Sequence, residues 1–262
     1  MDHSFKNLKN TVLVPPYSHI SHLYDKIMEH VNYYEWADYI KQIIRQFAPR
    51  SMSVCDISCG TGNMAFLLTS FGYHVYGLDQ SESMITIAQN KAQQDNQSLS
   101  FHVGDMRTFK LPLQVNVILS LYDSVNYLFS QNEFIEMFNS VYHALLPEGL
   151  FIFDICTQHN SLKYFTDYRD TGIIDGIRYH RHSYYETETN IQNTEFAVQY
   201  ANDSTWYIEQ HRQKIMATEE VDRHIPARLF DCIGKFDNFT FYKPSARTER
   251  IHYILKKRLL SA

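Results

Sequence analysis

Cysteine, long apolar runs and an excess of positive charge are all scarce in this sequence of 262 residues. The four cysteines (Cys55, Cys59, Cys156 and Cys232) are scattered and lack the spacing of a secreted disulfide framework. No apolar run reaches the roughly 18 to 20 residues of a membrane-spanning helix. The N-terminal residues also lack the basic-then-apolar layout of a signal peptide. We therefore expect a cytoplasmic protein that does not enter a membrane.

Charge and metal-ligand spacing argue against two further kinds of site. The net charge is −5, and the 24 Lys and Arg residues are dispersed, which argues against a broad nucleic-acid-binding surface. Cys55 and Cys59 flank a glycine-rich turn, but no neighbouring Cys or His completes a set of four ligands, so no metal site is expected. The hydrophobic fraction of 44% is enough for a sizeable core.

The most informative segment is a glycine-rich turn between a strand pattern at 52–57 and a helical pattern that starts at about Asn63. Residues 56–62 read Asp-Ile-Ser-Cys-Gly-Thr-Gly. Glycines allow positive φ and let a ligand approach the backbone. The helix start behind them offers unpaired N–H groups. The turn predicts a site for a nucleotide-like or amino-acid-like ligand. A phosphate-binding loop is excluded because no Lys-Ser/Thr pair follows, and a dinucleotide fingerprint lacks its third glycine.

Further elements follow in the order of a nucleotide-binding α/β domain. A strand at 73–78 ends in Asp79, about 20 residues after the turn, where a carboxylate can accept from both hydroxyls of a ribose. Ser81 is the expected N-cap of the next helix. Three more strands are expected at 99–103, 115–121 and 150–154, with a helix at 133–146 and the turn Pro147-Glu148-Gly149 before the last of them.

These motifs, over about residues 52–154, resemble those of the class I S-adenosylmethionine-dependent methyltransferases. The usual first motif of that family is acidic-x-Gly-Cys-Gly-x-Gly, and this chain departs from it at Ser58. The resemblance implies S-adenosylmethionine as the cofactor and an α/β, Rossmann-like fold. In that fold a seven-stranded, mostly parallel sheet has its last strand antiparallel and carries helices on both faces. It also implies that Asp105 bonds the adenine amino group and that the backbone N–H of Met106 meets the ring.

The expected cofactor-binding residues come from the glycine turn, the strand ends and the aromatic N-terminal segment, which can fold over the cofactor and stabilise a sulfonium by cation–π attraction. They are Tyr24, Trp36, Asp56, Ser58, Cys59, Gly60, Gly62, Asp79, Gln80, Met84, Gly104, Asp105, Met106, Leu121 and Tyr122. Packing in the core or at its rim is the competing interpretation for the N-terminal aromatic residues.

After the fifth strand, about 60 residues show polar–aromatic alternation. Segments at 177–185, 194–200 and 205–213 predict a three-stranded antiparallel insertion over the substrate side, with hairpin turns at Asn190 and at Asn202-Asp203. A helix from Pro226 to about Phe236 and strands at 239–242 and 249–257 should follow. We thus expect a helical cap over 1–50, a cofactor-binding core over 51–155, a β insertion serving as lid over 156–216, and a C-terminal helix with strands over 217–262.

This layout resembles the small-molecule branch of the family, which includes glycine and amino-sugar N-methyltransferases. The segment 209–213 is similar to a Glu-x-His-x-Gln strand of that branch and makes His211 a candidate group at the acceptor, with a surface histidine as the alternative. Asp123 can orient or deprotonate an amine, or simply cap the following turn. The expected catalytic residues are Asp123, Tyr127 and His211, and the expected substrate-binding residues are Tyr17, Tyr33, Asn126 and Arg181.

The expected reaction is in-line transfer of a methyl group from a sulfonium to a small-molecule amine or hydroxyl acceptor. Three alternatives stay open at this point: methylation of RNA or a protein side chain, cofactor binding without transfer in a regulatory subunit, and a different reaction of the same cofactor. The expected partner is the small-molecule acceptor, with neither metal, membrane nor nucleic acid, and self-association into a homodimer stays open.

Overall fold

The computed structural model describes the chain except for residues 1–4, 6, 96, 98 and 260–262. In the described part, a seven-stranded sheet has the order β11-β12-β6-β5-β2-β3-β4. Its strands are β2 (Ser53–Asp56), β3 (His74–Asp79), β4 (Ser100–Val103), β5 (Val115–Ser120), β6 (Leu145–Cys156), β11 (Phe230–Asp237) and β12 (Arg250–Lys257). Neighbours among β2 to β6 pair parallel, whereas β12 runs antiparallel to both β6 and β11. The predicted sheet is confirmed.

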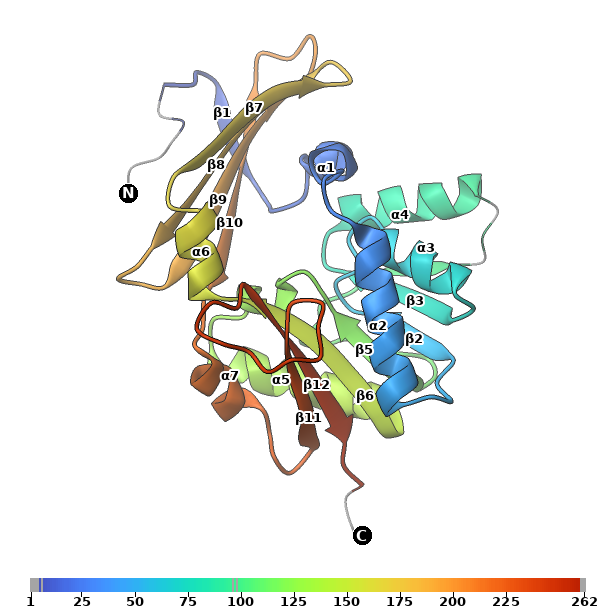
Figure 1. The fold of residues 1–262 in the computed structure, drawn as a ribbon. Coiled ribbons are helices and arrows are strands. Elements are labelled where there is room, and N and C mark those ends of the chain that lie inside the picture. Colours follow the sequence, from blue (N-terminus) through green and yellow to red (C-terminus); the bar gives the residue numbers. More distant parts are fainter. Residues whose placement is uncertain (1–4, 6, 96, 98, 260–262) are drawn as a thin grey trace.

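Helices cover both faces of this core sheet (Figure 1). The helices are α1 (Ser21–Ile27), α2 (Tyr33–Phe47), α3 (Asn63–Ser70), α4 (Glu82–Gln94), the 3-10 turn η1 (Ser124–Tyr127), α5 (Gln131–Ala144), α6 (Gln158–Tyr164) and α7 (Thr218–His224). Side chains of α2, α3 and α4 pack with Ile152 on one face, and those of α5 and α7 pack with Phe151 and Phe153 on the other. Because residues 150–153 of β6 are buried on both faces, this stretch is continuously apolar rather than alternating.

A second sheet stands beyond the carboxyl edge of the core sheet, with α1 between the two (Figure 1). Its order is β1-β10-β9-β8-β7, built from β1 (Thr11–Val14), β7 (Tyr168–Ile174), β8 (Ile177–Glu186), β9 (Ile191–Gln199) and β10 (Trp206–Lys214). We call it the lid sheet. The prediction of three antiparallel strands holds for β8, β9 and β10 but was incomplete. It missed β7, and it missed that β1 joins the sheet by pairing parallel with β10.

The predicted helix at 226–236 is wrong. Helix α7 ends at His224, and Phe230 begins strand β11, which pairs antiparallel with β12 and buries Phe230 against Phe138. This non-local pairing outweighs the local helix-start signal of Pro226. The predicted strand at 239–242 is also wrong, because that segment is a turn whose Thr240 carbonyl accepts the Tyr39 hydroxyl at 2.6 Å. In the described part of the chain, no helix has the length and apolar character needed to cross a membrane.

Candidate cofactor and acceptor site

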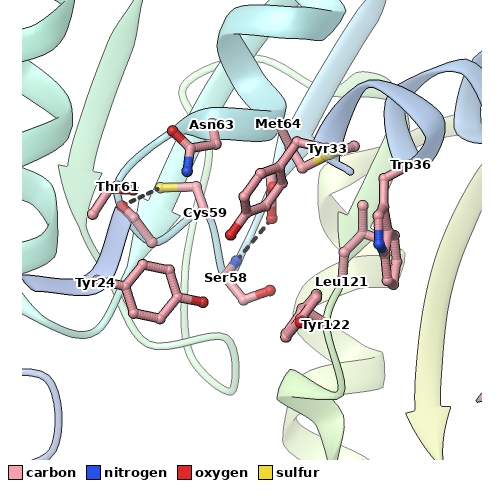
Figure 2. A pocket seen from close by; sticks show the side chains of 12 residues that line it. Tyr24, Tyr33, Trp36, Ser58, Cys59, Thr61, Asn63, Met64, Leu121 and Tyr122 are labelled. Carbon is pink, nitrogen blue, oxygen red and sulfur yellow. Dashed lines mark hydrogen bonds between the residues drawn. The ribbon is translucent and has the colours of Figure 1, made fainter. Parts of the chain in front are cut away.

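A cavity lies where the glycine turn after β2 meets the N-terminal helices and the loop after β5, and its space of about 430 Å³ includes the part that is open to solvent. Figure 2 shows the rings of Tyr24 and Tyr33 flanking the turn that carries Ser58 and Cys59. The lining residues are Tyr24, Tyr33, Trp36, Asp56, Ser58, Cys59, Gly60, Thr61, Asn63, Met64, Leu121 and Tyr122.

The two glycines of the turn have different tasks. Gly62 has φ of +87°, and a Cβ there would lie 2.8 Å from the ring of Phe101, so both conformation and packing require glycine. Gly60 has φ of +54°, and a Cβ there would meet no atom within 4 Å, so its open side faces free space. The Asp79 carboxylate accepts the Gly60 N–H at 2.9 Å and thereby joins the turn to the end of β3.

Two carboxyl groups beside the cavity resist ionisation. Burial raises the pKa of Asp56 to about 7, against the opposing N–H of Ser58. Burial also raises the pKa of Asp79, against the N–H groups of Ser81 and Gly60 that hold its two oxygens at 2.9 Å each. A cationic ligand in this cavity would stabilise the ionised form of both groups. The two carboxyl groups, the aromatic side chains that line the cavity and the free space at Gly60 fit a ligand such as S-adenosylmethionine.

An aromatic wall closes the side of the cavity next to the loop after β5. The rings of Trp36 and Tyr122 lie 5.4 Å apart, and the Arg250 guanidinium lies 5.2 Å and 4.9 Å from them. Arg250 also pairs with the carboxylates of Asp154 and Asp123, in the latter case at 2.6 Å. This buried cation therefore supports the wall from behind and neutralises two buried acids.

The N-terminal helix is fastened to the glycine turn by Asp25. Its carboxylate accepts the Thr61 hydroxyl at 2.6 Å and the Asn63 amide at 2.9 Å, and it pairs with Lys91 at 2.9 Å. Burial alone would raise the pKa of Asp25, but the bonds from Thr61 and Lys91 bring it below its ordinary value. These contacts of Asp25 place the neighbouring Tyr24 beside the cavity.

The predicted catalytic residues lie together between the core and the lid sheet. The Asp123 carboxylate is buried between Arg250 and the Gln213 amide, which donates to it at 2.5 Å. Tyr127 contacts His211 through its hydroxyl, at 3.1 Å from Nδ1. His211 is 4% exposed, so it is not a surface histidine.

The predicted substrate-binding residues lie in different parts of the site. The hydroxyls of Tyr17 and Tyr127 are 2.9 Å apart, and Tyr33 lines the cavity. Asn126 is fully buried, with its amide donating to Lys214 O at 2.7 Å and accepting from Cys156 N at 3.1 Å. Arg181 lies on the lid sheet with its guanidinium 5.6 Å from the ring of Phe196.

Gly62, Asp79 and the remaining predicted cofactor residues lie outside the cavity lining. Gln80 is exposed after β3 and Met84 is buried at the start of α4, while Gly104 donates its N–H to Asp79 O at 2.9 Å. Asp105 is held by Arg107, whose Nη2 lies 2.6 Å away, and Met106 packs against the core. Their contacts with the cofactor stay predictions.

Sequence reasoning missed several residues of the site. Thr61, Asn63 and Met64 line the cavity, and their position inside the glycine motif was the available signal. Asp154 and Arg250 became recognisable only when β6 and β12 were paired in the fold. In the described residues, no group of three or more His, Cys, Asp or Glu is arranged to hold a metal ion.

Sheet order, glycine turn and cavity position define the class I α/β methyltransferase type. The sequence model of a family described as a methyltransferase domain matches residues 54–149. The chain is 30% identical over 247 residues to the putative methyltransferase YqeM of Bacillus subtilis, covering 92% of this chain and 97% of that one. The chain therefore belongs to the S-adenosylmethionine-dependent methyltransferases, and S-adenosylmethionine is its cofactor.

Two further similarities are more distant. A dTDP-3-amino-3,6-dideoxy-α-D-glucopyranose N,N-dimethyltransferase of Streptomyces fradiae is 29% identical over 136 residues, which covers 51% of each chain. The crystal structure of an S-adenosylmethionine-dependent methyltransferase from Clostridium acetobutylicum superposes with a TM-score of 0.75 at 22% identity, covering 90% of this chain and 97% of that one. The second similarity confirms the fold.

Proposed function

We propose that this methyltransferase acts on an amino group of a small, hydroxyl-rich molecule. The observation that carries the proposal is the polar inner face of the lid sheet. Cross-strand pairing puts Ser183, Thr194 and His211 in one row on that face, with the two hydroxyls 2.9 Å apart. Another row, formed by Tyr185, Gln192 and Gln213, lies beside it. Hydroxyl, amide and imidazole groups suit a polar acceptor, which an apolar lid would not.

The orientation of this face supports the same proposal. Gln213 bonds Asp123 and His211 bonds Tyr127, so the polar rows face the loop after β5 rather than solvent. In parallel α/β sheets, ligands bind outside the carboxyl ends of the strands, where this loop lies. The curated relative from Streptomyces fradiae is named for an amino-sugar nucleotide, and that substrate class has the required amine and hydroxyls.

The cofactor, when bound, supplies a sulfonium methyl group for in-line displacement. The chain's own residues align the acceptor and exclude water, and alignment in a dry site is worth up to ~7 to 11 kcal/mol. Trp36 and Tyr122 form the apolar wall, and the lid sheet covers the acceptor side. An amine arrives protonated at neutral pH, so a group that accepts its proton is also needed.

The test is an assay with S-adenosylmethionine and dTDP-3-amino-3,6-dideoxy-α-D-glucopyranose, read by intact mass of the sugar nucleotide. A matched control uses dTDP-6-deoxy-α-D-glucopyranose, which differs from the amino sugar only in having a hydroxyl in place of the amine. We expect mono- and dimethylated product only from the amino sugar. Methyl transfer confined to RNA or protein, with no product across amino sugars and other small amines, contradicts the proposal.

A further inference from the structure

A continuous hydrogen-bond chain runs through the acceptor side of the site. The Tyr17 hydroxyl lies 2.9 Å from that of Tyr127, which lies 3.1 Å from Nδ1 of His211. The Nε2 atom of His211 lies 3.1 Å from the Glu209 carboxylate. These groups come from the N-terminal segment, from η1 and from β10, so the fold and not the local sequence brings them together.

Glu209 is the carboxylate at one end of the hydrogen-bond chain. It is fully buried and accepts the backbone N–H groups of Tyr17 and His19 at 2.6 Å each and that of Ile20 at 2.9 Å. Burial alone would raise the pKa of Glu209, but the bonds from His211 and Ile20 bring it below its ordinary value. An ionised carboxylate only accepts hydrogen bonds, so all four donors must point toward it.

The Glu209 carboxylate determines which group donates in each hydrogen bond of this hydrogen-bond chain. Because Glu209 accepts, Nε2 of His211 carries the hydrogen, and Nδ1 of the neutral ring is then an acceptor. Tyr127 therefore donates to His211, and Tyr17 donates to Tyr127. The Tyr17 oxygen keeps a free lone pair, and its ring packs edge-on against that of Tyr24, which lines the cavity, with 6.1 Å between centroids.

We propose that Tyr17, Tyr127, His211 and Glu209 form a proton relay that removes the proton from the acceptor amine. This inference rests on the proposed amine methylation. The N–H bond of the acceptor breaks, its electron pair stays on nitrogen, and the proton passes to the Tyr17 oxygen. The Tyr17 proton moves to Tyr127, and the Tyr127 proton moves to Nδ1 of His211. The resulting imidazolium is stabilised by the Glu209 carboxylate, and the proton returns to solvent after product release.

Neither tyrosine can serve as the base alone. Burial raises the pKa of Tyr17 well above its ordinary value of 10.0, with a further contribution from Tyr127, and burial also raises the pKa of Tyr127. The acids facing the two hydroxyls are Asp123 and Asp79 in addition to Glu209. They disfavour phenolate and favour a cation at the far end of the chain. His211 is the group in the relay whose Nδ1 lone pair can take the proton while its Nε2–H faces the Glu209 carboxylate.

The kinetic test compares wild type with Tyr127→Phe, which removes one hydroxyl from the middle of the chain. The acceptor is dTDP-3-amino-3,6-dideoxy-α-D-glucopyranose. We expect kcat to fall by about 100-fold or more, the scale of general-base catalysis. The acceptor KM and the affinity for S-adenosylhomocysteine should change less than about twofold, because no binding contact is lost. The dependence of kcat on pH should also differ between the wild type and the variant.

The matched control is Tyr164→Phe, since Tyr164 lies on α6 and is exposed, with its hydroxyl bonded to Glu249 at 3.2 Å. This variant should behave as wild type. A Tyr127→Phe enzyme with unchanged kcat and an unchanged pH profile overturns the relay.

A second arm of the test measures the tautomer of His211 instead of a rate. In the complex with S-adenosylhomocysteine, ¹⁵N spectra of the imidazole should show His211 as the Nε2–H tautomer at neutral pH. Turnover by an enzyme with His211 as the Nδ1–H tautomer overturns the relay alone, because Tyr127 would then have no acceptor for its proton. A wild-type protein that methylates no amine overturns the proposed function, and the relay with it.

Discussion

The carboxylate of Asp154 accepts the backbone N–H of Tyr122 at 2.7 Å and so holds an aromatic residue of the cofactor cavity in place. The same carboxylate accepts the N–H of Asp123 at 2.9 Å. Tyr122 and Asp123 have φ of 62° and 53°, a left-handed conformation that costs a non-glycine residue about 1 to 3 kcal/mol. Asp154 and Arg250 hold this strained pair in place, and we expect the position of Tyr122 to matter for cofactor binding.

Removing the charge of Arg250 should destabilise the protein strongly. In Arg250→Gln, the buried carboxylates of Asp123 and Asp154 lose their cation, and breaking a buried pair in this way costs about 3 to 5 kcal/mol. Urea unfolding measures the loss in free energy of unfolding. The control is Arg258→Gln, because Arg258 pairs with Asp231 at the surface, and its midpoint should stay that of wild type. Equal midpoints for both variants would show that the buried pair does not hold the loop.

Asp79 should contribute directly to cofactor affinity. We expect Asp79→Ala to weaken binding of S-adenosylmethionine by at least ~1 to 3 kcal/mol, since a charge-assisted bond to the ribose and the hold on the Gly60 N–H are both lost. Calorimetric titration measures the change. Glu136→Ala, an exposed acid on α5, serves as the control. Unchanged affinity in Asp79→Ala would remove the predicted position of the ribose.

His252 should make the protein sensitive to acid. The imidazole is fully buried among the rings of Trp36, Tyr39 and Phe239, and burial, followed by Arg250, lowers its pKa to about 3 from 6.5. Below pH 6.5 the imidazole of His252 binds a proton in the unfolded chain but stays neutral in the folded state. The unfolded state then binds more protons, so stability is lost as pH falls through this window.

Replacing this imidazole should therefore remove part of the acid sensitivity. We expect His252→Phe to show a higher melting temperature than wild type at pH 5 and a flatter dependence of melting temperature on pH below 6.5. Thermal unfolding across this range measures both. Parallel curves for the two proteins would show that His252 does not carry the effect.

Asp56 should change the stability of the protein with pH in the opposite direction to His252. Burial raises its folded-state pKa to about 7 from 3.8, so between these values the folded state binds more protons than the unfolded state. Stability from this group is present at low pH and is lost as pH rises toward 7. Asp56→Asn should be more stable than wild type at pH 8, by at most about 4 kcal/mol, and the gain should vanish near pH 4. A gain that is independent of pH would contradict the raised pKa.

The sequence was most informative where structure is set by neighbouring residues. Local sequence signals predicted the turn at 56–62, the N-cap Ser81 and the apolar strand that leads into the turn. All three appear in the structure. The parallel pairing of β1 with β10 joins residues that are far apart in the chain, so no local pattern predicts it. The same holds for Arg250 and Glu209, whose roles arise from contacts between distant segments.

The central claim is that the cavity between the glycine turn and the N-terminal aromatic residues holds S-adenosylmethionine. Calorimetric titration of the folded protein with S-adenosylmethionine and S-adenosylhomocysteine tests it most directly. The account predicts one site per chain for each ligand, with dissociation constants on the order of micromolar, about −8 kcal/mol, and weaker binding to Asp79→Ala. No heat of binding from either ligand, with a folded protein in the cell, would contradict it.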